Sequence, residues 1–383
     1  MQDSALVYGS FGAEQTDLIQ AALARASVQA RFCHEPDAAS RMLESSSVPG
    51  FVVVDTVSPG AEPVVRWLRA APGLWGMPLV GLVPHPTSAL FEEAHELGAD
   101  TVVPRTDLGA LTRQAGVLVS QRPAARTPVV NGSIVVAYPK DARRRELGRI
   151  ARGAGFEVLF AASREELTHL LATTSPRIVI ACRSLLADSV TEARATVGRV
   201  GGPLWVVVAP LGTLSKEATD LGGVGDVVFM SELAPSANLL FVMNEVMRGT
   251  GVEARASKRF LFGTLCAFRR AGRLDPCYGL TYNLSEGGLY IRGIEGPPPS
   301  TPLWVELRPP GSQAVVQLRG EVVWKRPIAA GPNAALSPAG FGFRIDPDET
   351  PANDLSEYKT GYAELSADAS RWPDRVYIGH SGH

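Results

Sequence analysis

The sequence predicts a multidomain protein in which two α/β domains precede a small all-β barrel. The 383 residues exceed the size of one typical core, so two or three domains are expected. In the first two thirds of the chain, short apolar runs alternate with amphipathic stretches, whereas later β-type runs follow one another without helices between them. The predicted segments are 1–120, 133–248, 255–350 and a C-terminal helix and tail at 351–383.

The first segment alternates apolar runs with stretches of helical spacing. The predicted strands are "ALVYG", "GFVVVD", "PLVGLV" and "DTVVP", and the predicted helices are "EQTDLIQAALARA", "PVVRWLRAA" and "SALFEEAHELG". Because short loops join these elements, we expect a parallel sheet with helices on both faces.

The second segment repeats this pattern after a predicted linker at 121–132 that contains prolines and arginines. Its predicted strands are "SIVVAY", "FEVLF", "RIVIAC", "PLWVVVA" and "DVVFM", and its predicted helices are "DARRRELGRIARGAG", "REELTHLLATT" and "SANLLFVMNEVMR". A repeat of about 125 residues indicates duplication of a domain rather than a solenoid unit.

A second predicted linker at 248–258 leads to the β-rich segment. Its predicted strands include "CYGLTYNL", "GLYIRG", "PLWVELRP" and "GFGFRI", separated by turns such as "EGPPPS" and "RPPGS". Many short strands without intervening helices predict a small antiparallel barrel or sandwich. The tail contains one predicted helix, "ANDLSEYKTGYAEL".

Composition excludes several classes of function. A net charge of −2 argues against general attraction to DNA or to anionic membranes. The four cysteines form no C-x-x-C pair and the histidines have no metal spacing, so neither a metal site nor a disulfide framework is expected. No apolar run reaches the roughly 18 residues of a membrane span, and the N-terminus lacks a secretory signal, so we expect a cytoplasmic protein without membrane insertion. No set of nucleophile, base and stabiliser indicates an enzyme, and no cofactor is expected.

The two α/β segments resemble response-regulator receiver domains, which have a flavodoxin-like (βα)5 fold. In "FVVVDTVSPG", Asp55 lies at the end of the third predicted strand, where that family has its phosphoacceptor, with Pro59 and Gly60 at the family's spacing. The first segment departs from the family in three ways: no acidic pair follows the first strand, Val83 stands in place of Ser or Thr, and Arg105 stands in place of Lys. Asp55 is therefore a candidate phosphoacceptor without most of the metal-binding and phosphate-binding groups that phosphoryl transfer requires.

The second segment has Cys182 at the position of the phosphoacceptor. We interpret it as a pseudo-receiver, which serves as a scaffold, a homodimerisation surface or a docking module for an unidentified protein partner. The Cys182 thiol at a strand end is expected to be buried and inert.

The β-rich segment resembles the PilZ family of cyclic di-GMP receptors. "RASKR" matches the family's R-x-x-x-R motif with Arg255 and Arg259, and "NLSEGG" matches its Asp/Asn-x-Ser-x-x-Gly motif with Asn283, Ser285 and Gly288. The final "GFGFRI" is also similar to the last strand of the family. The resemblance implies a six-stranded barrel that binds cyclic di-GMP through these five residues.

The chemistry of these residues suits that ligand. Arginine has a planar, permanently charged fork that pairs with guanine O6 and N7, grips phosphate or stacks on a base. Asn283 and Ser285 donate and accept hydrogen bonds at a turn, and Gly288 allows close approach of the backbone. Since both arginines lie in or beside the predicted linker, binding would order it and reorient the receiver-like segments. The resemblance implies a role in motility, surface polysaccharide production or biofilm control.

Two alternatives stay open at this point. The first is a phosphorylation-dependent response regulator in which Asp55 receives the signal and the barrel is the output. The second is a PilZ-type scaffold that binds no ligand, which a negative result for both phosphorylation and nucleotide binding would favour.

Overall fold

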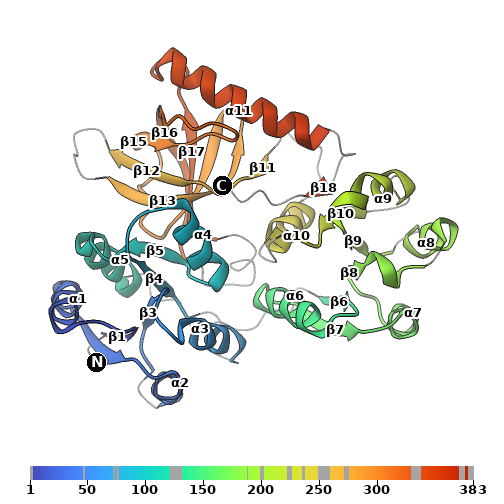
Figure 1. Cartoon of the computed structure of the whole chain (residues 1–383), viewed down its shortest axis with the longest axis horizontal. Coiled ribbons are helices and arrows are strands. Elements are labelled where there is room, and N and C mark those ends of the chain that lie inside the picture. Colours follow the sequence, from blue (N-terminus) through green and yellow to red (C-terminus); the bar gives the residue numbers. More distant parts are fainter. Residues whose placement is uncertain are drawn as a thin grey trace.

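The computed structural model describes most of the chain (Figure 1). The described residues are 3–45, 48–71, 74, 77–120, 132–187, 189–198, 202–221, 227–234, 238–248, 259–270, 276–328, 338–370 and 376–377. Arg255 and nearly all of both predicted linkers lie outside them.

The first domain has a five-stranded parallel sheet in the order β2-β1-β3-β4-β5, the order of flavodoxin-like folds. Its elements are β1 (Asp3–Tyr8), α1 (Ala13–Arg25), β2 (Val28–Cys33), α2 (Pro36–Glu44), β3 (Phe51–Asp55), α3 (Ala61–Ala70), β4 (Leu79–Val83), α4 (Ser88–Leu97), β5 (Thr101–Pro104) and α5 (Leu108–Ser120). Every residue of β3, β4 and β5 is buried, which explains why continuous apolar runs mark these strands. The predicted receiver-like fold is confirmed.

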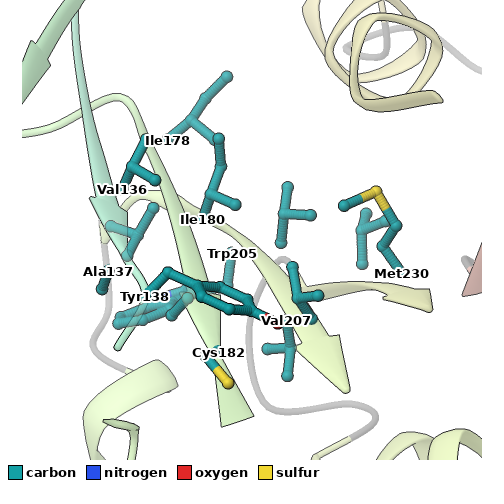
Figure 2. Close-up of a cluster of buried hydrophobic side chains, with 14 of the residues drawn as sticks. Val136, Ala137, Tyr138, Ile178, Ile180, Cys182, Trp205, Val207 and Met230 are labelled. Carbon is teal, nitrogen blue, oxygen red and sulfur yellow. The ribbon is translucent and has the colours of Figure 1, made fainter. Parts of the chain in front are cut away.

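The second domain repeats this strand order, β10-β9-β8-β6-β7, and adds β18 (Val376–Tyr377) beside β10. Its elements are β6 (Ser133–Ala137), α6 (Asp141–Gly153), β7 (Glu157–Ala161), α7 (Arg164–Thr173), β8 (Ile178–Cys182), η1 (Arg183–Leu185), α8 (Val190–Val197), β9 (Leu204–Ala209), η2 (Leu211–Thr213), α9 (Leu214–Leu221), β10 (Val227–Ser231) and α10 (Asn238–Arg248). Buried valines, isoleucines and Trp205 from its central strands form the core of this domain, part of which Figure 2 shows.

The third domain is an antiparallel barrel, as predicted. Six strands close it in the order β13-β12-β15-β16-β17-β14, with β14 returning to β13. Its elements are β11 (Phe260–Leu261), β12 (Leu265–Arg270), β13 (Cys277–Ser285), β14 (Gly288–Arg292), β15 (Pro302–Leu307), β16 (Val316–Arg326), β17 (Gly340–Ile345) and α11 (Ala352–Ser370). The short β11 pairs with β13 beyond the end of β12. Helix α11 adds the buried Tyr358 and Leu365 to the barrel core.

The barrel packs against both receiver-like domains, as the arrangement in Figure 1 shows. On the first domain it contacts α4 and the edge strand β5. Leu280 of β13 joins the apolar core on one face of that sheet, and Ile294 joins the core on the other face. The Leu265 amide also donates to the Ser88 hydroxyl of α4 over 3.1 Å. On the second domain the barrel contacts α10, whose Phe241 packs in a cluster with barrel residues.

Candidate functional site

The corner between β13 and β14, which carries the "NLSEGG" motif, is a tightly bonded turn. The Ser285 hydroxyl donates to the Gly288 carbonyl over 3.2 Å. The Tyr358 hydroxyl of α11 lies 2.7 Å from the Ser285 carbonyl and 3.2 Å from the Gly288 carbonyl. The Gly287 carbonyl accepts from the Ile345 amide over 3.0 Å. Helix α11 and strand β17 therefore fix the backbone of this corner, and the Ser285 oxygen keeps capacity to accept a hydrogen bond.

Gly288 lies too close to the neighbouring strand β17 to carry a side chain. A Cβ at this position would come closer than 3.0 Å to the carbonyl oxygen of Phe343 in β17, a separation that real Cβ atoms essentially never show. The glycine thus permits close pairing of β14 with β17, which is a structural reason for its place in the motif.

The short strand β11 begins directly after Arg259, the second arginine of the "RASKR" motif, and pairs with β13 near this corner. Phe260 pairs with Leu284 and Leu261 pairs with Asn283. Continuing this antiparallel register by one residue places the half-buried Arg259 across from Ser285. This register brings Arg259, just before β11, near Asn283 and Ser285 of β13, although it is far from them in the sequence. Arg255 lies outside the described residues.

An aromatic row beside Asn283 was not predicted from the sequence. Tyr282 and Tyr290 have ring centroids 5.4 Å apart, and those of Tyr290 and Trp324 are 4.8 Å apart. The strand register shifts between Thr281 and Asn283 and between Val322 and Trp324. The three aromatic side chains pack in a cluster separate from the barrel core. The Arg292 guanidinium lies 5.8 Å from the Tyr282 ring centroid. The sequence predicted "GLYIRG" as a strand, but alternation alone does not reveal the register shifts.

Charged groups lie at the interface between the first domain and the barrel. Arg113 Nε of α5 is 2.5 Å from Glu295 Oε1 of the barrel. Burial raises the pKa of Glu295, and the neighbouring Arg113 opposes this rise. On α4, the buried His95 donates from Nδ1 to the Ala99 carbonyl over 2.9 Å. Burial, and next the charge of Arg292, hold the pKa of His95 well below its ordinary value.

Asp55 of β3 is almost inaccessible to solvent, with 1% of its surface exposed. One carboxylate oxygen forms a hydrogen-bonded ion pair with the Arg105 guanidinium, and the other accepts a hydrogen bond from the Ser58 hydroxyl. The Ser58 hydroxyl in turn accepts from the Ser10 amide over 2.9 Å. The structure therefore brings Arg105 to Asp55, as its position after β5 suggested, and both oxygens of Asp55 already have partners.

The corresponding position of the second domain holds a thiol and a phenol. Figure 2 shows Tyr138, at the end of β6, close to Cys182 at the end of β8. Burial, and next the proximity of Cys182, raise the pKa of Tyr138 to about 12. Cys182 is 6% exposed, and its Sγ lies 3.2 Å from the Ser184 hydroxyl. Strand β8 thus ends in Cys182 where β3 of the first domain ends in Asp55.

The described residues contain no group of three or more His, Cys, Asp or Glu side chains arranged to hold a metal ion. In the same part of the chain, no helix has the length and apolar character needed to cross a bilayer.

Comparison with known proteins identifies the third domain. Residues 253–360 match the family model of the PilZ domain. No curated protein matches the chain.

Among solved structures, the chain is similar to the response regulator RPA3017 of R. palustris, with 16% identity over 29% of this chain and 90% of that chain at a TM-score of 0.26. It is also similar to a putative two-component response regulator/GGDEF domain protein, with 16% identity over 64% and 98% at a TM-score of 0.31. The PilZ domain of CeSA from a cellulose-synthesizing bacterium matches with 16% identity over 29% and 99% at a TM-score of 0.20.

Proposed function

We propose that this chain, which carries a PilZ domain at residues 253–360 behind two receiver-like domains, is a signalling adaptor that binds cyclic di-GMP. One observation carries the proposal. Extended by one residue, the register of β11 on β13 would set Arg259 across from Ser285 and near Asn283, which supports a meeting of the two halves of the sequence motif.

The chemistry of this strand pair fits a cyclic dinucleotide with two phosphates and two guanines. The guanidinium of Arg259 offers charge for a phosphate and a planar fork for a guanine edge. The amide of Asn283 and the hydroxyl of Ser285 supply neutral donors and acceptors. Arg255, four residues before Arg259, would add the second guanidinium. Since Asn283 is 6% exposed, the ligand must displace the side chains that cover it.

The position of the site suggests how binding would act on the rest of the protein. Helix α10 of the second domain ends at Arg248, and β11 begins at Phe260. A ligand held by the arginines between these elements would set the orientation of the second domain relative to the barrel. The receiver-like domains would then present a changed surface to a protein partner or to a second copy of the chain. By resemblance to the PilZ family, the regulated process is motility, surface polysaccharide production or biofilm control.

Isothermal titration calorimetry of the full chain with cyclic di-GMP tests the proposal. We expect saturable binding by the unmodified chain and at least tenfold weaker binding by Arg255→Ala and Arg259→Ala, because each loses charge-assisted hydrogen bonds. Arg308→Ala, an exposed arginine of the same domain outside the motif, is the matched control and should bind normally. Absence of heat with the unmodified chain, or unchanged affinity in both motif variants, would refute the proposal.

A second candidate function is phosphoryl transfer to Asp55, and the observation that favours it is the contact with Arg105. A cation at this place could hold a phosphoryl oxygen once Asp55 is modified. Against it, Asp55 is 1% exposed and both of its oxygens are bonded. Incubation with radiolabelled acetyl phosphate should label the unmodified chain but not Asp55→Asn if this function exists, and equal labelling of both would exclude it.

A further inference from the structure

Strand β11, which directly follows Arg259, contacts α11 through Phe260 and α10 through Leu261. Directly after β11, the Phe262 carbonyl accepts a hydrogen bond from the Thr281 hydroxyl over 2.6 Å, which holds this end of the strand against β13. On the side of Arg259, in contrast, ladder pairing within the described residues ends at Phe260. The Phe260 ring packs on Tyr362 of α11, with centroids 5.7 Å apart. Leu261 packs in a cluster that includes Phe241 of α10.

Phe241 belongs to the second receiver-like domain but packs on the barrel. Its neighbours on α10, Leu239, Val242 and Met243, are buried in the core of the second domain. Phe241 is instead 2% exposed in a cluster with Leu261, Tyr282 and Tyr290 of the barrel. Its ring meets that of Tyr282 edge to face, with centroids 5.8 Å apart and an interplanar angle of 73°. Such aromatic pairs fix the relative position of the elements that carry them.

We infer that Phe241 is a positioning residue for the nucleotide site on the barrel. A strand of two residues forms few ladder hydrogen bonds, so the packing of its side chains is needed to fix its register. Phe241 packs in one cluster with Leu261, which pairs with Asn283, and with Tyr282, the residue before Asn283. It thereby stabilises the arrangement that places Arg259 across from Ser285.

This inference rests on the proposed binding of cyclic di-GMP and makes the second domain part of that event. Coupling between two sites is reciprocal. If docking of Phe241 favours the bound position of Arg259, then bound nucleotide favours docking of Phe241 to the same degree. The ligand therefore tightens the contact between α10 and the barrel.

The first test is calorimetric titration of the full chain with cyclic di-GMP. We expect Phe241→Ala to bind about tenfold more weakly, within the 5- to 150-fold range typical of coupled sites. Phe241→Leu, which keeps an apolar side chain against Leu261, should recover most of the affinity. Met243→Ala removes a buried side chain from the same helix but from the core of the second domain, and should bind like the unmodified chain.

A second readout separates positioning from general loss of stability. If Phe241 acts through Arg259, Phe241→Ala should weaken binding less when Arg259 is already replaced by lysine. A full, additive effect in the Arg259→Lys background would contradict the inference. Should Phe241→Ala fail to give a folded chain by circular dichroism, Leu261→Ala removes the same contact from the barrel side and carries the same expectation.

The outcomes distinguish this inference from the proposed function. Absence of binding by the unmodified chain overturns both. Normal binding by the unmodified chain and by folded Phe241→Ala overturns the role of Phe241 alone. Hydrogen exchange supplies an independent check, since amides of α10 and β11 should exchange more slowly in the presence of cyclic di-GMP, and unchanged or faster exchange of both would contradict the coupling.

Discussion

Replacing Gly288 by alanine is expected to destabilise the barrel. The new Cβ would lie less than 3.0 Å from the carbonyl oxygen of Phe343 and 3.4 Å from its carbonyl carbon. Both strands belong to the closed barrel, where Gly288 pairs with Arg344 and Leu289 pairs with Phe343. Neither backbone can therefore move aside without weakening the pairing of β14 with β17.

The expected cost follows from the kind of atom that the methyl group meets. Overpacking of a well-packed site costs about 1–3 kcal/mol. Because the obstacle is a strand carbonyl rather than the end of a flexible side chain, we expect about 2–3 kcal/mol for Gly288→Ala. For a domain of about 100 residues this corresponds to a fall in melting temperature of roughly 10 °C or more.

Differential scanning calorimetry measures this effect, and the adjacent glycine supplies the control. A Cβ at Gly287 would have no neighbour within 4 Å, so Gly287→Ala should change the free energy of unfolding by less than about 0.5 kcal/mol. If Gly288→Ala melts like the unmodified chain but binds cyclic di-GMP less tightly, the glycine serves the ligand directly and the argument from strand spacing is wrong.

Three further predictions concern the first domain and its interface with the barrel. Arg105→Ala should lower the free energy of unfolding, measured by chemical denaturation, by about 3–5 kcal/mol because it leaves the buried Asp55 carboxylate without its cation. Adding Asp55→Asn should recover much of this loss, and equal stability of the single and the double variant would contradict the prediction. His95 has a lowered pKa in the folded state, so the unfolded state binds more protons once the pH is below the ordinary histidine pKa. The free energy of unfolding should therefore fall as the pH drops below about 6.5, by at most about 1.4 kcal/mol per pH unit. The fall should be less steep in His95→Gln. A double-mutant cycle of Arg113→Ala and Glu295→Ala should give a coupling energy of about 0.5–1 kcal/mol because both side chains are partly exposed, and a value near zero would mean that the pair does not stabilise the interface.

The fold could be predicted where burial is uniform. Strand β3 is buried on both faces, so its sequence is an apolar run that stands out without any structural knowledge. Strand β2, in contrast, is fully buried only at its ends, Val28 and Cys33, and Gln29 and Arg31 interrupt its apolar residues, so no continuous apolar run marks it. Helix α2 has only two fully buried residues, Ala39 and Leu43, and was missed for the same reason.

The site could be predicted only as far as its motifs. The candidate residues Arg259, Asn283 and Ser285 were chosen by motif spacing, whereas the pairing of β11 with β13, which decides how near they lie, is not revealed by local sequence. The contact of Phe241 with the barrel was hidden because the apolar run "LLFVM" of α10 covers more than one face of the helix. A helix that is apolar on two faces contacts two partners, and this is the signal that could have indicated an interface with the barrel.

The central claim is that Arg259 and the β13–β14 corner form one site that recognises both the guanines and the phosphates of cyclic di-GMP. The most direct test is calorimetric titration of the full chain with cyclic di-GMP and, separately, with cyclic di-AMP, which has the same phosphates but lacks guanine O6. Since a bidentate arginine–guanine pair discriminates by about 1–3 kcal/mol, the account predicts saturable binding of cyclic di-GMP and at least roughly tenfold weaker binding of cyclic di-AMP. Equal affinity for the two nucleotides, or no binding of cyclic di-GMP, would contradict it.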